Sequence, residues 1–132
     1  MTLVDTSAWV EYLRSTDSRV HRRLRDLLAE RAPLHTTDVV VMEVLAGGRD
    51  EAHTDGLRRL LSRCEFVATT GLDDFEQSAS IYRRCRRGGE TPRAVNDCLV
   101  AAVALRAEVD VLHADRDFDV IARQTTLRIH PV

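Results

Sequence analysis

Residues 2–10 read TLVDTSAWV, and this stretch contains the pattern on which the fold is built. A short apolar run ends in the polar residues Asp5, Thr6 and Ser7, after which apolar side chains recur at helical spacing. The same order of a short apolar run, polar residues and an amphipathic stretch returns along the chain. Alternation of this kind predicts an α/β protein with a mainly parallel sheet that is covered by helices on both faces.

Short β-like runs and periodic apolar stretches place the remaining elements. Strands are predicted at 2–4, 34–36, 65–69, 110–113 and 127–129. Helices are predicted from about residue 8 through 13, at 17–31, from 37 or 38 through 45, and at 50–62, 72–87, 91–107 and 118–123. The start at residue 91 depends on Thr91-Pro92, which reads as an N-cap followed by a first-turn proline.

Length and composition restrict the class of protein. A chain of 132 residues with 44% hydrophobic and 30% charged residues is predicted to form one globular domain over residues 1–132. No apolar run approaches the ~20 residues of a membrane span, and no basic stretch precedes an apolar run as in a secretory signal. We therefore expect a cytoplasmic protein without a membrane anchor.

The basic residues and cysteines exclude several kinds of chemistry. The chain has no lysine, which excludes a Schiff-base lysine and a Walker A lysine. Its net charge of −2 argues against a uniformly basic nucleic-acid binder. Cys64, Cys85 and Cys98 form no CxxC pair, as expected of reduced thiols rather than of a zinc site. Carboxylates and hydroxyls are left to carry the chemistry.

Four acids lie at positions that are unusual for solvated charge. Glu43 and Asp97 are inside predicted helices that are otherwise nearly all apolar, whereas Asp5 and Asp115 follow apolar strands, with Asp117 two residues further on. Each has an ordinary explanation. An acid after a strand can form a turn or cap a helix, as Asp117 can for the helix that follows it, and a buried acid can pair with an arginine.

Taken together, these acids indicate a metal site. The carboxyl ends of parallel strands share one sheet edge, so Asp5 and Asp115 should converge there. Two carboxylates ~4 Å apart repel by about 4 kcal/mol at an effective dielectric of 20. Several can stay ionised together only with a cation between them, and oxygen ligands favour Mg²⁺ or Mn²⁺. The residues therefore point to metal-dependent phosphoryl chemistry.

Four motifs in order resemble the motif series of PIN-domain ribonucleases, and more narrowly that of VapC-type toxins of toxin–antitoxin pairs. They read DTSAW at 5–9, MEVLAG at 42–47, NDCLVAA at 96–102 and DRDF at 115–118. The resemblance covers essentially the whole chain and implies a three-layer α/β/α sandwich. It also implies Mg²⁺- or Mn²⁺-dependent cleavage of single-stranded or looped RNA.

The resemblance assigns a role to each acid. Asp5 and Asp97 are the implied principal metal ligands, Glu43 is a third acid that acts directly or through water, and Asp115 completes the quartet. Asp117 either assists a second metal or only caps a helix. Ser7, or less readily Thr6, is implied to orient a metal-bound water or a phosphate oxygen, unless its hydroxyl only caps the first helix.

One position departs from the family pattern. His113 stands where the family often has threonine or serine, two residues before Asp115. A hydroxyl contact is therefore not expected there. His113 is predicted either to contact RNA or, with more weight, simply to end the strand.

The resemblance also implies partners: a second copy of the chain in a homodimer, and a VapB-type antitoxin whose tail crosses the acidic groove and often inserts an arginine. Two alternatives remain open. A haloacid-dehalogenase-type phosphatase would use Asp5 as its nucleophile, but it would want an acid at Ser7 and a downstream lysine. A catalytically silent PIN-like binding module would be expected to have lost some of the acids.

Overall fold

The apolar run that begins the chain lies in the middle of a parallel sheet. In the computed structural model, which describes residues 1–132, β1 (Thr2–Val4) pairs with β2 (Leu34–Thr36) on one side and with β4 (Asp110–Leu112) on the other. β3 (Glu65–Phe66) pairs with β2, so that the strand order is β3-β2-β1-β4 and every pairing is parallel. The predicted parallel sheet is confirmed, and its strands are short.

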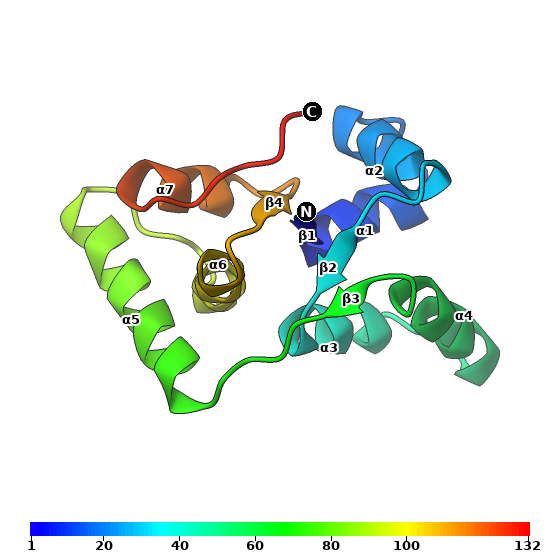
Figure 1. Ribbon diagram of the computed structural model, residues 1–132, viewed down its shortest axis with the longest axis horizontal. Coiled ribbons are helices and arrows are strands. Elements are labelled where there is room, and N and C mark those ends of the chain that lie inside the picture. The colour runs from blue at the N-terminus through cyan, green and yellow to red at the C-terminus, as the bar shows by residue number, and fades with distance from the viewer.

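Seven helices surround this sheet. Their bounds are Thr6–Leu13 for α1, Arg19–Ala29 for α2, Asp38–Ala46 for α3, Glu51–Leu61 for α4, Leu72–Arg87 for α5, Val95–Ala107 for α6 and Arg116–Gln124 for α7. α5 and α6 lie on one side of the sheet, and α1 and α2 lie on the other (Figure 1). The predicted three-layer α/β/α arrangement is therefore confirmed. None of the helices combines the length and the apolar character that crossing a bilayer would need.

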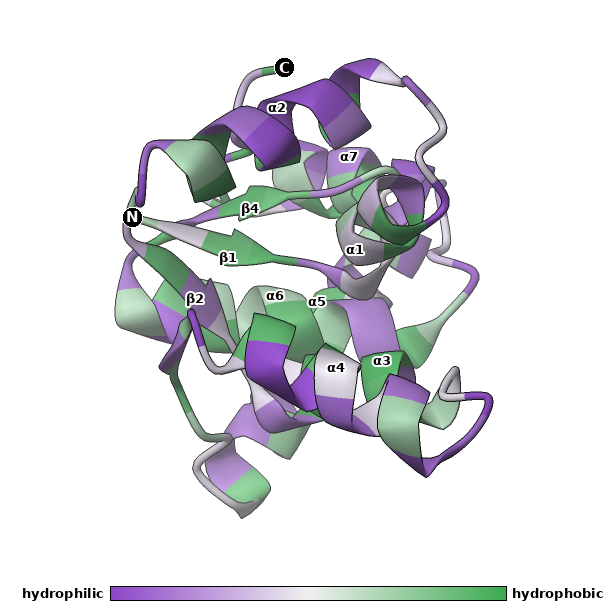
Figure 2. Ribbon diagram, turned by 90° about the vertical axis from the view of Figure 1, so that its right-hand side faces the viewer, coloured by the Kyte–Doolittle hydropathy of each residue, from purple (hydrophilic) through white to green (hydrophobic).

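The core forms where the sheet meets α6. Every residue from Cys98 to Ala104 of α6 is buried, and a helix that is apolar all round has to be enclosed by its neighbours. α2 instead carries its apolar side chains on one stripe and its arginines on the other, and Figure 2 shows this contrast between the two helices. Trp9 of α1 and Phe118 of α7 are fully buried and complete the core. The buried position of α6 holds Asp97 in its first turn close to the sheet.

Two predicted strands are shorter in the structure. The run 65–69 forms a strand only over Glu65–Phe66, because the chain then leaves β2 after a last bond from the Val67 N–H to the Thr36 carbonyl. The run 127–129 forms only an isolated bridge between Ile129 and Val111. The prediction of a closing strand at 127–129 is therefore wrong: this segment only touches the outer edge of β4.

The start of α6 also differs from the prediction. The helix begins at Val95 rather than at Thr91-Pro92, and its N-cap residue, Ala94, is extended. The reason is a carboxylate from a distant part of the chain. The side chain of Asp117 accepts hydrogen bonds from the backbone N–H groups of Arg93 and Ala94, which holds the two residues before the helix in place, and Thr91 is not the N-cap residue.

An ion pair between a buried acid and an arginine that is partly exposed ties α5 to α6. The guanidinium of Arg106 donates to both carboxylate oxygens of Asp74, at 3.1 and 2.9 Å, and to the carbonyl of Ala68 at 2.7 Å. The Thr70 N–H donates to Asp74 as well, at 2.7 Å. Burial alone would raise the pKa of Asp74, but the bonds from Arg106 and Thr70 outweigh it and hold the pKa below its ordinary value. This ion pair fixes the segment that leads from β3 to α5.

Replacing Asp74 by asparagine should lower the free energy of unfolding at pH 7 by about 1–3 kcal/mol, because the Arg106 guanidinium then loses its charged partner. The folded pKa of Asp74 lies below the unfolded value, so its contribution is present above about pH 4 and is lost as the pH falls through the folded pKa. Urea denaturation at pH 7 and in acid would measure both effects. Asp73→Asn, on an exposed neighbour in the same helix, is the control. Equal stability of the two variants at pH 7 would contradict the role given to Asp74.

Candidate metal centre

Asp5 directly follows β1, and both its backbone and its side chain are hydrogen-bonded. Its N–H donates to the Leu112 carbonyl at the end of β4 (3.0 Å), and its residue is only 3% exposed. Its Oδ2 atom accepts hydrogen bonds from the N–H and the hydroxyl of Ser7, at 3.0 and 2.6 Å. Burial raises the pKa of Asp5 despite these bonds. Asp5 is therefore the N-cap of α1, and the neighbouring hydroxyls are not.

The two hydroxyls after Asp5 each hold another part of the site. Besides donating to Asp5, the Ser7 hydroxyl accepts a bond from the Ala114 N–H (2.9 Å), which links the loop after β4 to the end of β1. The Thr6 hydroxyl donates to Oε1 of Glu43 on α3, at 2.9 Å. The expectation that either hydroxyl only caps the first helix is therefore wrong. Burial and the nearby charge of Asp5 raise the pKa of Glu43, although the Thr6 bond opposes them.

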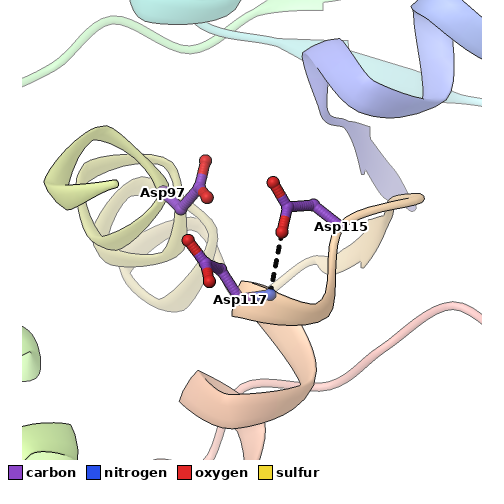
Figure 3. Close-up of side chains that lie close together, drawn as sticks. All are labelled: Asp97, Asp115 and Asp117. Carbon is purple, nitrogen blue, oxygen red and sulfur yellow. Dashed lines mark hydrogen bonds between the residues drawn. The ribbon is translucent and has the colours of Figure 1, made fainter. Parts of the chain in front are cut away.

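Three further carboxylates gather beside this edge. One oxygen atom each of Asp97, Asp115 and Asp117 lies within 4.8 Å of the other two. Figure 3 shows Asp97 projecting from α6 toward the beginning of α7, where Asp115 and Asp117 stand. Burial, a side-chain hydrogen bond with Asp117 and the charges of Asp5, Asp115 and Asp117 together raise the pKa of Asp97 to about 8. Three of the five acids singled out in the sequence therefore lie together.

Asp117 holds the backbone just before α6, a role that the sequence pattern had given to Thr91. It is 2% exposed, and its Oδ2 atom accepts the N–H groups of Arg93 at 2.9 Å and of Ala94 at 3.0 Å. These bonds outweigh burial and lower the pKa of Asp117. Asp117 binds the two N–H groups just before α6, whereas the following helix α7 is capped by Asp115, whose Oδ1 accepts the Asp117 N–H at 2.9 Å. The prediction that Asp117 caps the following helix is wrong.

His113 supports Asp115 instead of merely ending the strand. β4 ends at Leu112, and the side chain of His113 is only 8% exposed. Its Nδ1 accepts the Asp115 N–H at 3.0 Å, so in the neutral ring the proton is on Nε2, which faces Asp119 at 3.3 Å. The ring packs against Phe118, with 5.2 Å between the ring centres. His113 therefore shapes the turn that carries Asp115 and is too buried for the predicted contact with RNA.

Arg93 is the one residue of the cluster that sequence reasoning missed. Its guanidinium lies 3.2 Å from Oδ1 of Asp115 and 3.8 Å from Oδ1 of Asp117. Its position four residues before Asp97 carries no signal of this contact, because local patterns place residue 93 inside a helix that in fact begins at Val95. Arg93 lies beside the carboxylates because its N–H group and that of Ala94 are bonded to the side chain of Asp117.

The carboxylate cluster fits a hard divalent cation. Oδ2 of Asp97 is buried and has no hydrogen-bond partner, which is costly for a polar atom unless a cation or a proton satisfies it. Asp97, Asp115 and Asp117 together offer oxygen ligands only, and Mg²⁺ and Mn²⁺ prefer such ligands. The charge of Asp5 helps to raise the pKa of Asp97, whereas Glu43 is influenced by Asp5 and lies outside the cluster of three acids. A carboxylate-lined cation site of this kind suits hydrolysis of phosphate esters.

Known proteins match the chain over nearly its whole length. The model of the PIN domain family matches residues 2–124. Ribonuclease VapC11 from Mycobacterium tuberculosis is 44% identical over 129 residues, which cover 97% of this chain and 96% of that protein. The VapC ribonuclease Mb1587 from Mycobacterium bovis matches with the same identity and coverage.

Solved structures show the same fold at low sequence identity. The VapBC2 complex from Rickettsia felis, bound to a DNA fragment from its promoter, superposes with a TM-score of 0.74 at 17% identity, covering 98% of this chain and 96% of that chain. VapBC-1 from nontypeable Haemophilus influenzae gives a TM-score of 0.74 at 16% identity with the same coverage. The arrangement of sheet and helices is therefore shared with these toxin complexes.

Replacing Asp97 by asparagine should stabilise the metal-free protein at alkaline pH. The folded pKa of Asp97, about 8, lies above its unfolded value. Asp97 therefore costs no stability below about pH 4, and it lowers the free energy of unfolding increasingly as the pH rises toward 8. Asparagine keeps the shape without the charge. We expect a gain of about 1–2 kcal/mol at pH 8.5 after allowance for solvent screening, and no gain at pH 4. Thermal denaturation in EDTA at both pH values would measure it, and a gain that does not depend on pH would contradict the ionisation argument.

Proposed function

The chain belongs to the PIN-domain family, and from that premise we propose that it is the ribonuclease toxin of a toxin–antitoxin pair, cleaving RNA with Mg²⁺ or Mn²⁺. The observation that carries the proposal is the cluster of Asp97, Asp115 and Asp117 from two separate segments, with an unpartnered carboxylate oxygen on Asp97 and the charge of Asp5 acting on it. Identity of 44% to a protein named ribonuclease VapC11, over nearly the whole chain, supports the same reaction.

We assign the ligand role to Asp5, Asp97 and Asp115. A bound Mg²⁺ or Mn²⁺ would lower the pKa of a water molecule and neutralise the negative charge that develops on the phosphodiester. Asp117 holds the start of α6 and offers its Oδ1 to the cluster, so it assists from the side. Ser7 keeps Asp5 oriented through its two hydrogen bonds.

Glu43 is suited to move a proton. Its raised pKa brings it nearer to neutral pH than an ordinary glutamate, and the Thr6 hydroxyl fixes its orientation. We assign to Glu43 the acceptance of the proton from the attacking water. One water then adds across the P–O bond, which leaves two shorter RNA strands.

Two partners follow from the family and from the charge of the site. Solved relatives are complexes named VapBC, and we propose that a VapB-type antitoxin binds this chain as well. A guanidinium from such a partner can pair bidentately with the carboxylates and block the site. We also propose that the protein acts as a homodimer in the cytoplasm, where its RNA substrate is present, and that residues 1–132 act as one nuclease domain.

Cleavage of end-labelled total RNA by the antitoxin-free protein tests the nuclease directly. Discrete fragments should appear with Mg²⁺ or Mn²⁺ and disappear with EDTA. Asp5→Ala and Asp97→Asn should each lower the rate by more than about 100-fold, since even the loss of an outer-shell partner of a metal site costs about 10–100-fold. Asp73→Asn, which changes the same charge on an exposed helix face, should cleave like the unmodified protein.

Other results would favour other functions. Fragments that persist in EDTA or in both active-site variants would contradict metal-dependent cleavage by these acids. Absence of cleavage of every RNA offered, by folded protein with bound metal, would favour a binding module without catalysis.

A further inference from the structure

Arg93 stands out among the 19 arginines because it alone is ion-paired with the carboxylate cluster. Its Nη2 donates to Oδ1 of Asp115 at 3.2 Å, and its Nε lies 3.8 Å from Oδ1 of Asp117. A positive charge therefore already occupies the mouth of the site that a divalent cation fits. The other ion pairs of the chain involve none of these carboxylates.

The backbone of Arg93 is fixed by a hydrogen bond, whereas its side chain is exposed and can change conformation. The backbone N–H is bonded to Oδ2 of Asp117, and the neighbouring Pro92 is buried. The side chain is 68% exposed. The guanidinium can consequently leave Asp115 and turn into solvent while the start of α6 keeps its hydrogen bonds. Arg93 thus has a fixed base and a mobile charged end.

Asp115 does not depend on Arg93 for its orientation. Its Oδ1 also accepts the Asp117 N–H at 2.9 Å, and its own N–H donates to Nδ1 of His113 at 3.0 Å. If the guanidinium were removed, the carboxylate would keep its place. The charge of Arg93 would be lost, and with it the repulsion of any other cation that approaches the same oxygens.

We propose that Arg93 is the built-in counter-ion of this metal centre: its guanidinium pairs with Asp115 and Asp117 in the metal-free protein and competes with the divalent cation for these carboxylates. This inference rests on the proposed metal site and adds a residue that sets its affinity. Arg93 is a positioning residue, which acts through Asp115 and Asp117. It weakens the binding of the cation and steadies the acids when the cation is absent.

Calorimetric titration of the metal-free full chain with Mn²⁺ at pH 8, without RNA, tests the proposal. Arg93→Gln should bind Mn²⁺ about tenfold more tightly than the unmodified protein, because the competing charge is gone. Arg93→Lys, which keeps the charge, should bind within about threefold of the unmodified protein. Arg116→Gln is the matched control: Arg116 is 65% exposed on the same helix terminus as Asp117, pairs with Glu90, and its loss changes the net charge equally.

Thermal denaturation in EDTA provides a second measurement. Arg93→Gln should unfold at a lower temperature than the unmodified protein in EDTA and should gain more from added Mn²⁺. The proposal is overturned if Arg93→Gln binds Mn²⁺ equally or more weakly, or if Arg116→Gln tightens binding as much. These outcomes separate it from the proposed function, because RNA cleavage that requires metal and Asp97 would still stand if Arg93 had no effect on Mn²⁺ affinity.

Discussion

Mutual repulsion of carboxylates at one edge of the sheet is the constraint on which the rest of this structure depends. Oxygen atoms of Asp97, Asp115 and Asp117 lie within 4.8 Å of one another, and two unit charges 4.8 Å apart repel by about 3.5 kcal/mol at an effective dielectric of 20. The consequence is visible in Asp97, whose pKa rises to about 8 as burial and its neighbours act together. Such an arrangement is stable only because the fold holds each acid separately.

In each of four acids, one carboxylate oxygen accepts hydrogen bonds from neighbouring groups of the chain, which leaves the second oxygen for the site. The held atoms and their donors are Oδ2 of Asp5 with Ser7, Oε1 of Glu43 with Thr6, Oδ1 of Asp115 with the Asp117 N–H, and Oδ2 of Asp117 with the N–H groups of residues 93 and 94. Outer-shell bonds of this kind orient metal ligands before the metal arrives. The fifth acid, Asp97, is placed by the buried helix α6 and leaves Oδ2 without a partner.

Much of this arrangement was predictable from sequence, because it depends on local patterns. Short apolar runs and helical periodicity identified the parallel sheet and most helices, and misplaced acids such as Asp97 and Asp115 pointed to the candidate metal centre. The parts that failed depend on contacts between distant segments. Thr91-Pro92 has the form of a helix start, but α6 begins at Val95. The backbone just before it is held by Asp117, which lies 24 residues after Arg93 in the sequence and accepts its N–H. Arg93 was missed for the same reason.

Crystals of the protein soaked in Mn²⁺ and measured for anomalous scattering at the manganese edge would test the central claim most directly, namely that these acids form one cation site. The account predicts one or two anomalous peaks among the carboxylates of Asp5, Asp97 and Asp115, with metal–oxygen distances of about 2.0–2.3 Å. Peaks only at exposed surface acids, or none near Asp97 at saturating Mn²⁺, would contradict it.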